Sequence, residues 1–378
     1  MIYVSDHLCQ INKNGCTVCG DYTLCERTAR GMLYVVSDGI GSGVYANIAA
    51  IMCAERLREH FRLGVPLRAS VEMTAGSMHR ARTENMPFSA FSAAMILPDG
   101  QFSVFAYEAP HPILIRDNFA SVLSPRFFTA NYEVVGEFTG TLGLNDILLL
   151  ASDGVTQSGM GRGYNFGLGS EGVADFINKN FSDDADTLAE KVAKHCKDLS
   201  GGKYEDNTTI AILQCREPKE LTLLTGPPSM RRMNPEYAKV LADAAGKKVI
   251  CGSTTMDIIS EELGIPVTPL VTKNNNGMPP EYIMEGVDIA AEGAITLSQV
   301  CNILGEPVEQ MEGNSYVKRL CILLREADII HMHVGNAIND AHESLSFKQV
   351  GVQVRRKAVR SITEILRAMG KLVIVTNY

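Results

Sequence analysis

The sequence lacks several features that would have assigned it to well-known classes. No apolar run approaches the roughly twenty residues that a membrane-spanning helix needs. Basic clusters are short, at Arg231–Arg232 and Arg355–Lys357, and the net charge is −8, whereas nucleic-acid surfaces need clustered Lys and Arg. The segment Met1–Leu8 has no basic start and contains an acid, unlike a secretory signal. We therefore expect a cytoplasmic protein that neither spans a membrane nor binds nucleic acid.

A disulfide framework and a nucleotide-binding loop are also missing. The 10 cysteines are irregularly spaced in a chain of 378 residues, which predicts reduced thiols. Cys16 and Cys19 have a spacing typical of zinc ligands, but no second tight pair accompanies them, so plain thiols are favoured over a metal cluster. Neither G-x-G-x-x-G nor G-x4-G-K-[ST] occurs.

The length of the chain exceeds that of one typical domain. Its composition shifts at Arg216–Glu220, a short polar stretch that Pro218 interrupts. We therefore predict two domains, residues 1–216 and 217–378.

The most informative stretch in the first domain surrounds Asp38. An apolar, Val-rich run predicts a buried strand that ends at Asp38, and glycines at 39, 41 and 43 allow a sharp turn. A helix is predicted from Val44 to Phe61, so the turn lies at a helix N-terminus, where an ion or a phosphate can bind. An ordinary strand, turn and helix with a turn aspartate would look the same. We expect the apolar stripe of this helix to comprise Ile48, Ile51, Met52, Leu57 and Phe61.

Three further aspartates stand beside predicted strands. Asp21 precedes the strand that ends at Asp38, at a separation suited to a hairpin. Asp153 follows an apolar strand and is itself followed by glycine, and Asp206 begins another strand. Clustered carboxylates repel one another and normally need cations. Oxygen ligands favour Mg²⁺ or Mn²⁺, and two such ions about 3.5–4 Å apart can activate water for phosphate-ester hydrolysis.

The remaining pattern of the first domain indicates two sheets with helices outside them. A D-G turn at Asp99–Gly100 joins two strand-like runs. A second helix is predicted after Pro66, and two more near 170–180 and 183–199. Helices before and after a strand-rich centre predict a two-sheet core that is covered on both faces.

Four ordered stretches carry a family resemblance. CGDYT, VVSDGIGSG, LLLASDGVTQSG and YEDNTTIAIL resemble the metal-binding motifs of PPM-type, metal-dependent serine/threonine protein phosphatases, and most of all their SpoIIE-like bacterial branch. The resemblance covers roughly residues 1–215. It implies an α-β-β-α sandwich with two Mn²⁺ or Mg²⁺ ions at one edge, and a phosphorylated regulatory protein as the substrate, hydrolysed at phosphoserine or phosphothreonine.

The resemblance also implies roles for individual residues. Asp38 would bridge both ions and the Gly39 carbonyl would bind one of them. Asp153 and Asp206 would hold the other ion, and Asp21 would act directly or through water. Asp38 and Asp153 are thus the residues expected to be catalytic. The stretch Glu108–Pro112 departs from the Gly-His-Pro turn that is frequent in related enzymes, and no arginine is assigned to the substrate phosphate.

The second domain alternates strands and helices, which predicts a mostly parallel, doubly wound, Rossmann-like sheet. Small polar turns, TGPPS, CGSTT, AEGAIT and VGNAIND, follow four of its strands and should meet at one edge. Ligands bind at that edge in open α/β sheets, although short turns of any such domain look alike. The residues that we expect to bind a small anionic ligand are Gly226, Ser253, Thr254, Thr255, Glu292 and Asn336.

Two functions are compatible with these patterns. The first is a metal-dependent protein phosphatase whose second domain senses a small molecule or docks a partner. The second is a catalytically inactive, phosphatase-like signalling or scaffold protein whose second domain binds a small anionic ligand. The four acids favour the enzyme, because a site without catalysis has no need of costly neighbouring carboxylates. Helices that flank the sheets offer a surface for a homodimer.

Overall fold

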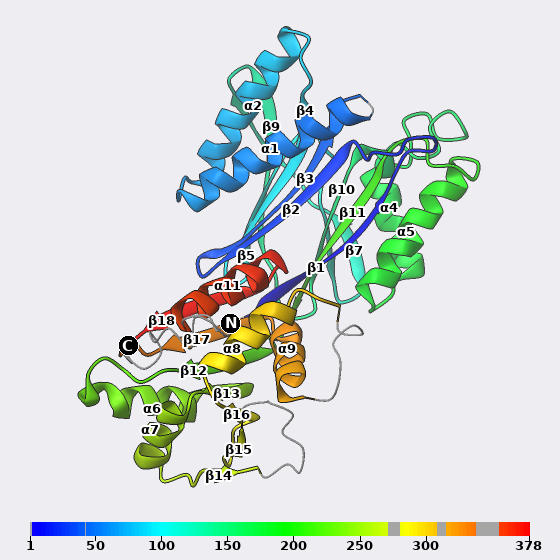
Figure 1. Cartoon of the computed structure of the whole chain (residues 1–378). Helices are drawn as coiled ribbons and strands as arrows, with labels where there is room; N and C mark the ends of the chain where they lie inside the picture. The colour runs from blue at the N-terminus through cyan, green and yellow to red at the C-terminus, as the bar shows by residue number, and fades with distance from the viewer. Residues whose placement is uncertain (1, 42, 271–279, 308–314, 338–354) are drawn as a thin grey trace. The chain divides into compact units, whose positions relative to one another are not determined.

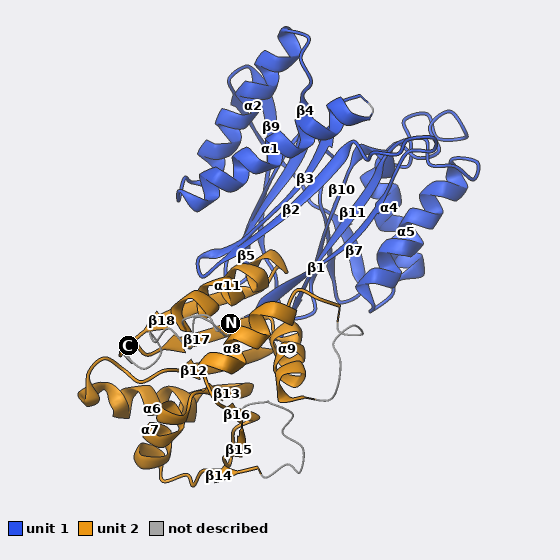
Figure 2. Cartoon of the chain, in the orientation of Figure 1, with its two compact units in different colours: residues 1–217 blue, residues 218–378 orange. Residues whose placement is uncertain are grey.

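The computed structural model describes residues 2–41, 43–270, 280–307, 315–337 and 355–378. These residues form two compact units, Met1–Glu217 (unit 1) and Pro218–Tyr378 (unit 2), shown in Figure 2. Each unit has its own sheets and its own buried cores, and each is described by itself. No helix in the described part of the chain is both long and apolar enough to cross a membrane.

Unit 1 contains two antiparallel sheets. The six-stranded sheet consists, in spatial order, of β2 (Asp21–Thr28), β3 (Gly31–Gly39), β4 (Ser89–Ile96), β5 (Gln101–Tyr107), β9 (Glu133–Thr141) and β8 (Arg126–Ala130). The five-stranded sheet consists of β1 (Tyr3–Ile11), β11 (Thr208–Arg216), β10 (Ile147–Ala151), β6 (Ile113–Arg116) and β7 (Phe119–Val122).

Helices cover the outer face of each sheet, so unit 1 has four layers (Figure 1). Helices α1 (Val44–Arg62) and α2 (Leu67–Thr83) pack on the six-stranded sheet. Helices α4 (Gly169–Asn180) and α5 (Ala185–Leu199) pack on the five-stranded sheet. The predicted α-β-β-α sandwich is thus confirmed.

Strands β3 and β10 read as continuous apolar runs because both of their faces are buried. In β10, Leu148 and Leu150 face the core between the two sheets, whereas Leu149 faces α4 and α5. In β3, Tyr34 faces the core between the sheets and Val35 faces α1. Two consecutive residues of each strand therefore enter different cores.

The predicted apolar stripe of α1 was partly wrong. Ile48 and Met52 are exposed, with 46% and 61% of their surface accessible, while Leu57 and Phe61 are buried as expected. Small side chains instead make most of the buried face of α1: Ala46, Ala49, Ala50, Cys53 and Ala54. They let the helix lie close to the sheet, which a ranking by hydrophobicity alone does not anticipate.

Unit 2 is built on one seven-stranded sheet. Its strands are, in spatial order, β14 (Thr268–Pro269), β15 (Glu281–Ile283), β16 (Ile289–Ala291), β13 (Lys247–Cys251), β12 (Glu220–Thr225), β17 (Ile329–Val334) and β18 (Leu372–Asn377). The five strands from β16 to β18 are parallel, and only the short β14 and β15 at one edge pair antiparallel.

Helices cover both faces of this sheet. After a short 3₁₀ turn at Arg231–Met233, α6 (Asn234–Asp243) and α7 (Ser253–Leu263) pack on one face. The other face is covered by α8 (Ala294–Ile303), α9 (Tyr316–Glu326) and α11 (Arg355–Ala368). Because the five strands from β16 to β18 are parallel, their carboxyl ends lie at the same edge of the sheet.

Candidate functional site

Asp21 and Asp38 lie opposite each other at one end of the β2–β3 hairpin. The Gly39 amide donates to the Gly20 carbonyl at 3.3 Å, which extends the strand pairing just beyond the two aspartates. Asp21 is buried, and its Oδ2 accepts a hydrogen bond of 2.6 Å from the Thr209 hydroxyl of the other sheet. Its Oδ1 is buried and has no hydrogen-bond partner among the described residues. One oxygen of Asp21 is thus held in place and the other is left for a ligand.

The segments that carry Asp153 and Asp206 approach each other at the neighbouring residues Gly154 and Asn207. Asp153 begins the short helix α3 (Asp153–Thr156) directly after β10. A Cβ on Gly154 would overlap the carbonyl oxygen of Asn207, so only glycine permits this approach. The side-chain amide of Gln157 donates to Asp153 Oδ2 at 2.8 Å. The backbone amide of Asn207 donates to Asp206 Oδ1 at 2.9 Å.

The electrostatics show that the four carboxylates influence one another. Burial, followed by the neighbouring carboxylates of Asp21 and Asp153, raises the pKa of Asp38 to about 10. Burial raises the pKa of Asp21 to about 6, and burial with the Asp206 carboxylate nearby raises the pKa of Asp153. Among the described residues, the cation paired with this group is Lys13, whose Nζ lies 3.9 Å from Asp206 Oδ1. Negative charge is therefore poorly compensated.

The donor set fits hard divalent cations. It consists of carboxylate and carbonyl oxygens, includes the unpartnered Asp21 Oδ1, and carries poorly compensated negative charge. In the described part of the chain, no three His, Cys, Asp or Glu side chains already surround a common point at metal distance. An ion held by these aspartates would complete its shell with water and backbone oxygen, as Mg²⁺ usually does.

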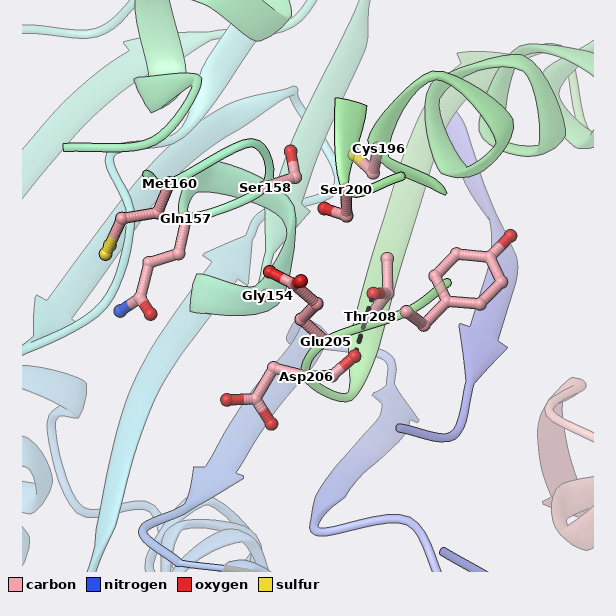
Figure 3. Close-up of a pocket in the computed structure, with 10 residues that line it drawn as sticks. Gly154, Gln157, Ser158, Met160, Cys196, Ser200, Glu205, Asp206 and Thr208 are labelled. Atoms are coloured by element: carbon pink, nitrogen blue, oxygen red, sulfur yellow. Dashed lines mark hydrogen bonds between the residues drawn. The ribbon is translucent and has the colours of Figure 1, made fainter. Parts of the chain in front are cut away.

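A cavity of about 120 Å³ lies beside Asp206 (Figure 3). Residues from three segments line it: Gly154, Gln157, Ser158, Met160, Cys196, Ser200, Tyr204, Glu205, Asp206 and Thr208. Beside it, Arg162 forms an ion pair of 2.9 Å with Glu205. Asp206 is the aspartate of the cluster that borders this cavity, together with Gly154, the neighbour of Asp153.

Sequence reasoning missed three residues that hold the acids in position. Thr209 fixes Asp21, Gln157 fixes Asp153, and the Asn207 carbonyl fits against Gly154. All three stand in the stretches DGVTQSG and DNTT, which drew attention only for their acids. The hydroxyl and amide side chains within those stretches were the available signal.

The residues predicted to bind a ligand in unit 2 follow the carboxyl ends of β12, β13, β16 and β17, at one edge of the sheet. Gly226 follows β12, and Ser253, Thr254 and Thr255 form the first turn of α7. The Glu292 carboxylate accepts hydrogen bonds from the amides of Ala294 and Ile295 at 3.2 and 3.1 Å, so it caps α8. The Asn336 amide donates to Tyr378 O at 2.8 Å. Residues 338–340 of the fourth turn lie outside the described residues.

Comparison with known proteins agrees with the fold of unit 1. The model of the family "Stage II sporulation protein E (SpoIIE)" matches residues 28–216, which is half of the chain. No curated protein matches the sequence.

Solved structures resemble the chain at low sequence identity. The PP2C phosphatase domain with a fragment of the regulatory domain of SpoIIE from Bacillus subtilis has 18% identity and a TM-score of 0.50, over 57% of this chain and 64% of that chain. RsbX in complex with magnesium has 18% identity and a TM-score of 0.41, over 57% and 100%. The RsbU and RsbW domains of Rv1364c from Mycobacterium tuberculosis have 16% identity and a TM-score of 0.49, over 64% and 67%. The first similarity establishes a shared fold, although this chain spans less than two thirds of that relative.

Proposed function

The chain belongs to the family of stage II sporulation protein E (SpoIIE), and from this premise we propose that unit 1 is a metal-dependent protein phosphatase. It hydrolyses phosphoserine or phosphothreonine on a regulatory protein, with two Mn²⁺ or Mg²⁺ ions as cofactors. The observation that carries the proposal is the position of Asp38, whose pKa is raised by its burial and by three neighbouring carboxylates. Such a cluster is costly without cations.

The aspartates have different parts in this proposal. Asp38 would be the ligand shared by the two ions, because Asp21 lies opposite it on β2 and the Asp153 carboxylate is near enough to raise its pKa. Asp153 and Asp206 would hold one ion, and the Gly39 carbonyl oxygen would bind the other. When bound, the ions supply activation of a water nucleophile and neutralise charge on the phosphoryl group. Thr209 and Gln157 orient the carboxylates of Asp21 and Asp153.

The geometry supports this enzyme over an inactive scaffold. Thr209 and Gln157 each donate a hydrogen bond to a carboxylate of the cluster. Gly154 permits the backbone of Asn207, next to Asp206, to approach Asp153. These contacts hold like charges close together. Without bound cations, that arrangement would lower the stability of the folded protein. Unit 2 is proposed to regulate this activity or to dock the partner.

The test is hydrolysis of p-nitrophenyl phosphate and of a phosphoserine protein by the full chain, after chelation and after addition of Mn²⁺ or Mg²⁺. We expect activity only with the metal, and a loss of at least about a hundredfold in D38N and D153N. The matched control is D175N, which changes an exposed aspartate of α4 away from the cluster. Activity that survives chelation, or that survives in D38N, contradicts the proposal.

A further inference from the structure

The carboxyl edge of the unit 2 sheet contains buried polar groups that the protein leaves without partners. The hydroxyls of Thr225 and Thr255 are buried, both side chains having 0% of their surface exposed, and neither has a hydrogen-bond partner among the described residues. The same holds for Nε of Arg355. Buried polar atoms of native proteins nearly always have partners, so three orphans at one edge call for an explanation.

The Thr255 hydroxyl points into the junction between two glycine turns. The position that a Cβ on Gly252 would occupy lies 3.2 Å from Thr255 Oγ1 and 3.9 Å from the Gly226 amide nitrogen. The glycine therefore lets the Thr255 hydroxyl and the Gly226 amide lie close to the N-terminus of α7, where a side chain at position 252 would crowd the hydroxyl. Gly252 is the N-cap of α7, has a φ of 134°, and provides no side chain to cap the helix.

The first turn of α7 is also open to an anion. Its first turn contains no acid, and no side chain caps its amides. At α8, by contrast, Glu292 already occupies the equivalent position. A helix N-terminus with uncapped amides attracts negative charge, and here it lies directly beside the orphaned Thr255 hydroxyl.

A cation without an acidic partner completes the arrangement. The Arg355 guanidinium lies against Gly226, where a Cβ would overlap it, and Nη2 donates to the carbonyls of Gly335 and Ala337 at 2.8 and 3.1 Å. No carboxylate pairs with it in the part of the chain that the structure describes. Burial lowers the pKa of Arg355, and the nearby Arg356 acts in the same direction.

Thr225 adds a donor on the side of α11. It shares a face of β12 with Leu221 and Leu223, which belong to the core that α11 covers. Thr225 thus precedes the Gly226 turn and faces the side of the sheet that α11 covers. The Gly226 amide and the Arg355 guanidinium lie together at the end of β12, and the Thr255 hydroxyl lies beside the neighbouring Gly252 turn. Among the described residues, neither threonine hydroxyl has an acceptor, and Nε of Arg355 has none.

We infer that unit 2 binds the phosphate group of a small molecule at this edge, between the first turn of α7, the hydroxyls of Thr225 and Thr255, and the guanidinium of Arg355. A phosphate group has enough acceptor oxygens to meet donors from several directions at once, and a guanidinium pairs with it in a bidentate manner. The site is independent of the aspartate cluster of unit 1.

The test measures binding of inorganic phosphate and of glycerol 3-phosphate to the full chain by calorimetry, with a chelator present so that unit 1 holds no metal. We expect saturable binding, and an affinity at least about tenfold lower in T255V and in R355Q. Tighter binding of glycerol 3-phosphate identifies a phosphorylated metabolite as the ligand class, and tighter binding of inorganic phosphate identifies the free ion. R355K, which keeps the charge, should bind more tightly than R355Q.

The controls are two matched changes on α11. R360Q removes an exposed arginine that pairs with Glu364, and T363V removes a buried hydroxyl that donates to Val359 O at 2.8 Å. Both should bind the probes as the unaltered chain does. Without ligand, T255V should melt no earlier than the unaltered chain, because it removes an unsatisfied hydroxyl.

Three results would overturn the inference. One is no saturable binding of either probe up to about 10 mM. Another is unchanged affinity in T255V. The third is a clear loss of stability in ligand-free T255V, since the hydroxyl would then already have a partner.

Discussion

Gly154 fits against the carbonyl oxygen of Asn207 so closely that a Cβ on the glycine would overlap it. The two residues are neighbours of Asp153 and Asp206, and they belong to segments far apart in the sequence. Their contact therefore sets the separation of two carboxylates. Gly39, next to Asp38, is packed in a similar way, because a Cβ added there would overlap the backbone of Ala46 in α1.

Replacing Gly154 with alanine should separate Asp153 from Asp206. The added methyl group must push the Asn207 backbone away, at a cost of about 1–3 kcal/mol in the free energy of unfolding. We expect metal-dependent hydrolysis to fall more than stability does, when phosphatase assays are compared with thermal melting. G143A is the control, since a Cβ there meets its nearest atom at an ordinary 3.5 Å. Equal activity in G154A and G143A would contradict the role given to this contact.

Replacing Asp38 with asparagine should have opposite effects on stability and activity. In chelated protein, D38N removes a carboxyl group whose ionisation is opposed by burial and by Asp21 and Asp153, so unit 1 should gain at least about 1 kcal/mol. With Mn²⁺ present, the unaltered chain should gain stability and D38N should not. Thermal melting with and without metal measures both. A D38N protein that is less stable than the unaltered chain after chelation argues against an uncompensated cluster.

Replacing Thr209 with valine should weaken metal binding through Asp21. The lost hydrogen bond of 2.6 Å leaves the Asp21 carboxylate free to rotate. Partners of metal ligands are typically worth about 10–100-fold in metal affinity. We expect the Mn²⁺ concentration for half-maximal activity to rise accordingly, with a smaller change in the rate at saturating metal. T209S keeps the hydroxyl and should restore the affinity; if it behaves like T209V, the effect comes from packing.

Unit 2 should lose stability in mild acid through His333. Burial, and then the neighbouring His331, lowers the pKa of His333 from 6.5 to about 4. Since the folded state binds this proton less readily than the unfolded state, stability is fully present above pH 6.5 and declines as the pH falls toward 4. His333 Nδ1 also lies 3.1 Å from the Tyr378 hydroxyl. Melting of H333Q should depend less on pH between 4 and 6.5 than melting of the unaltered chain; identical pH profiles would exclude His333 as the cause.

Much of the architecture could be predicted because local patterns carry it. The D-G turn after Ile96 joins β4 to β5, and the alternation of strands and helices after Glu217 gives the parallel sheet of unit 2. The small antiparallel strands β14 and β15 were not predicted, because two or three residues are too few to show a period. The face of α1 was misjudged, because closeness to the sheet favoured alanines over Ile48 and Met52.

The sequence by itself singled out the residues that we propose to carry the chemistry: four aspartates beside strand ends, three of them followed directly by glycine or asparagine. It also determined the layers, since apolar periodicity is local. Only the tertiary structure decided that Asp21 lies opposite Asp38 and that Thr209 reaches Asp21 from the other sheet. It also decided that, among the described residues, the Thr255 hydroxyl and Nε of Arg355 are buried without a hydrogen-bond partner at one edge of unit 2. The physical reason is that strand register and close backbone approach depend on contacts between segments distant in the chain, which no local pattern encodes.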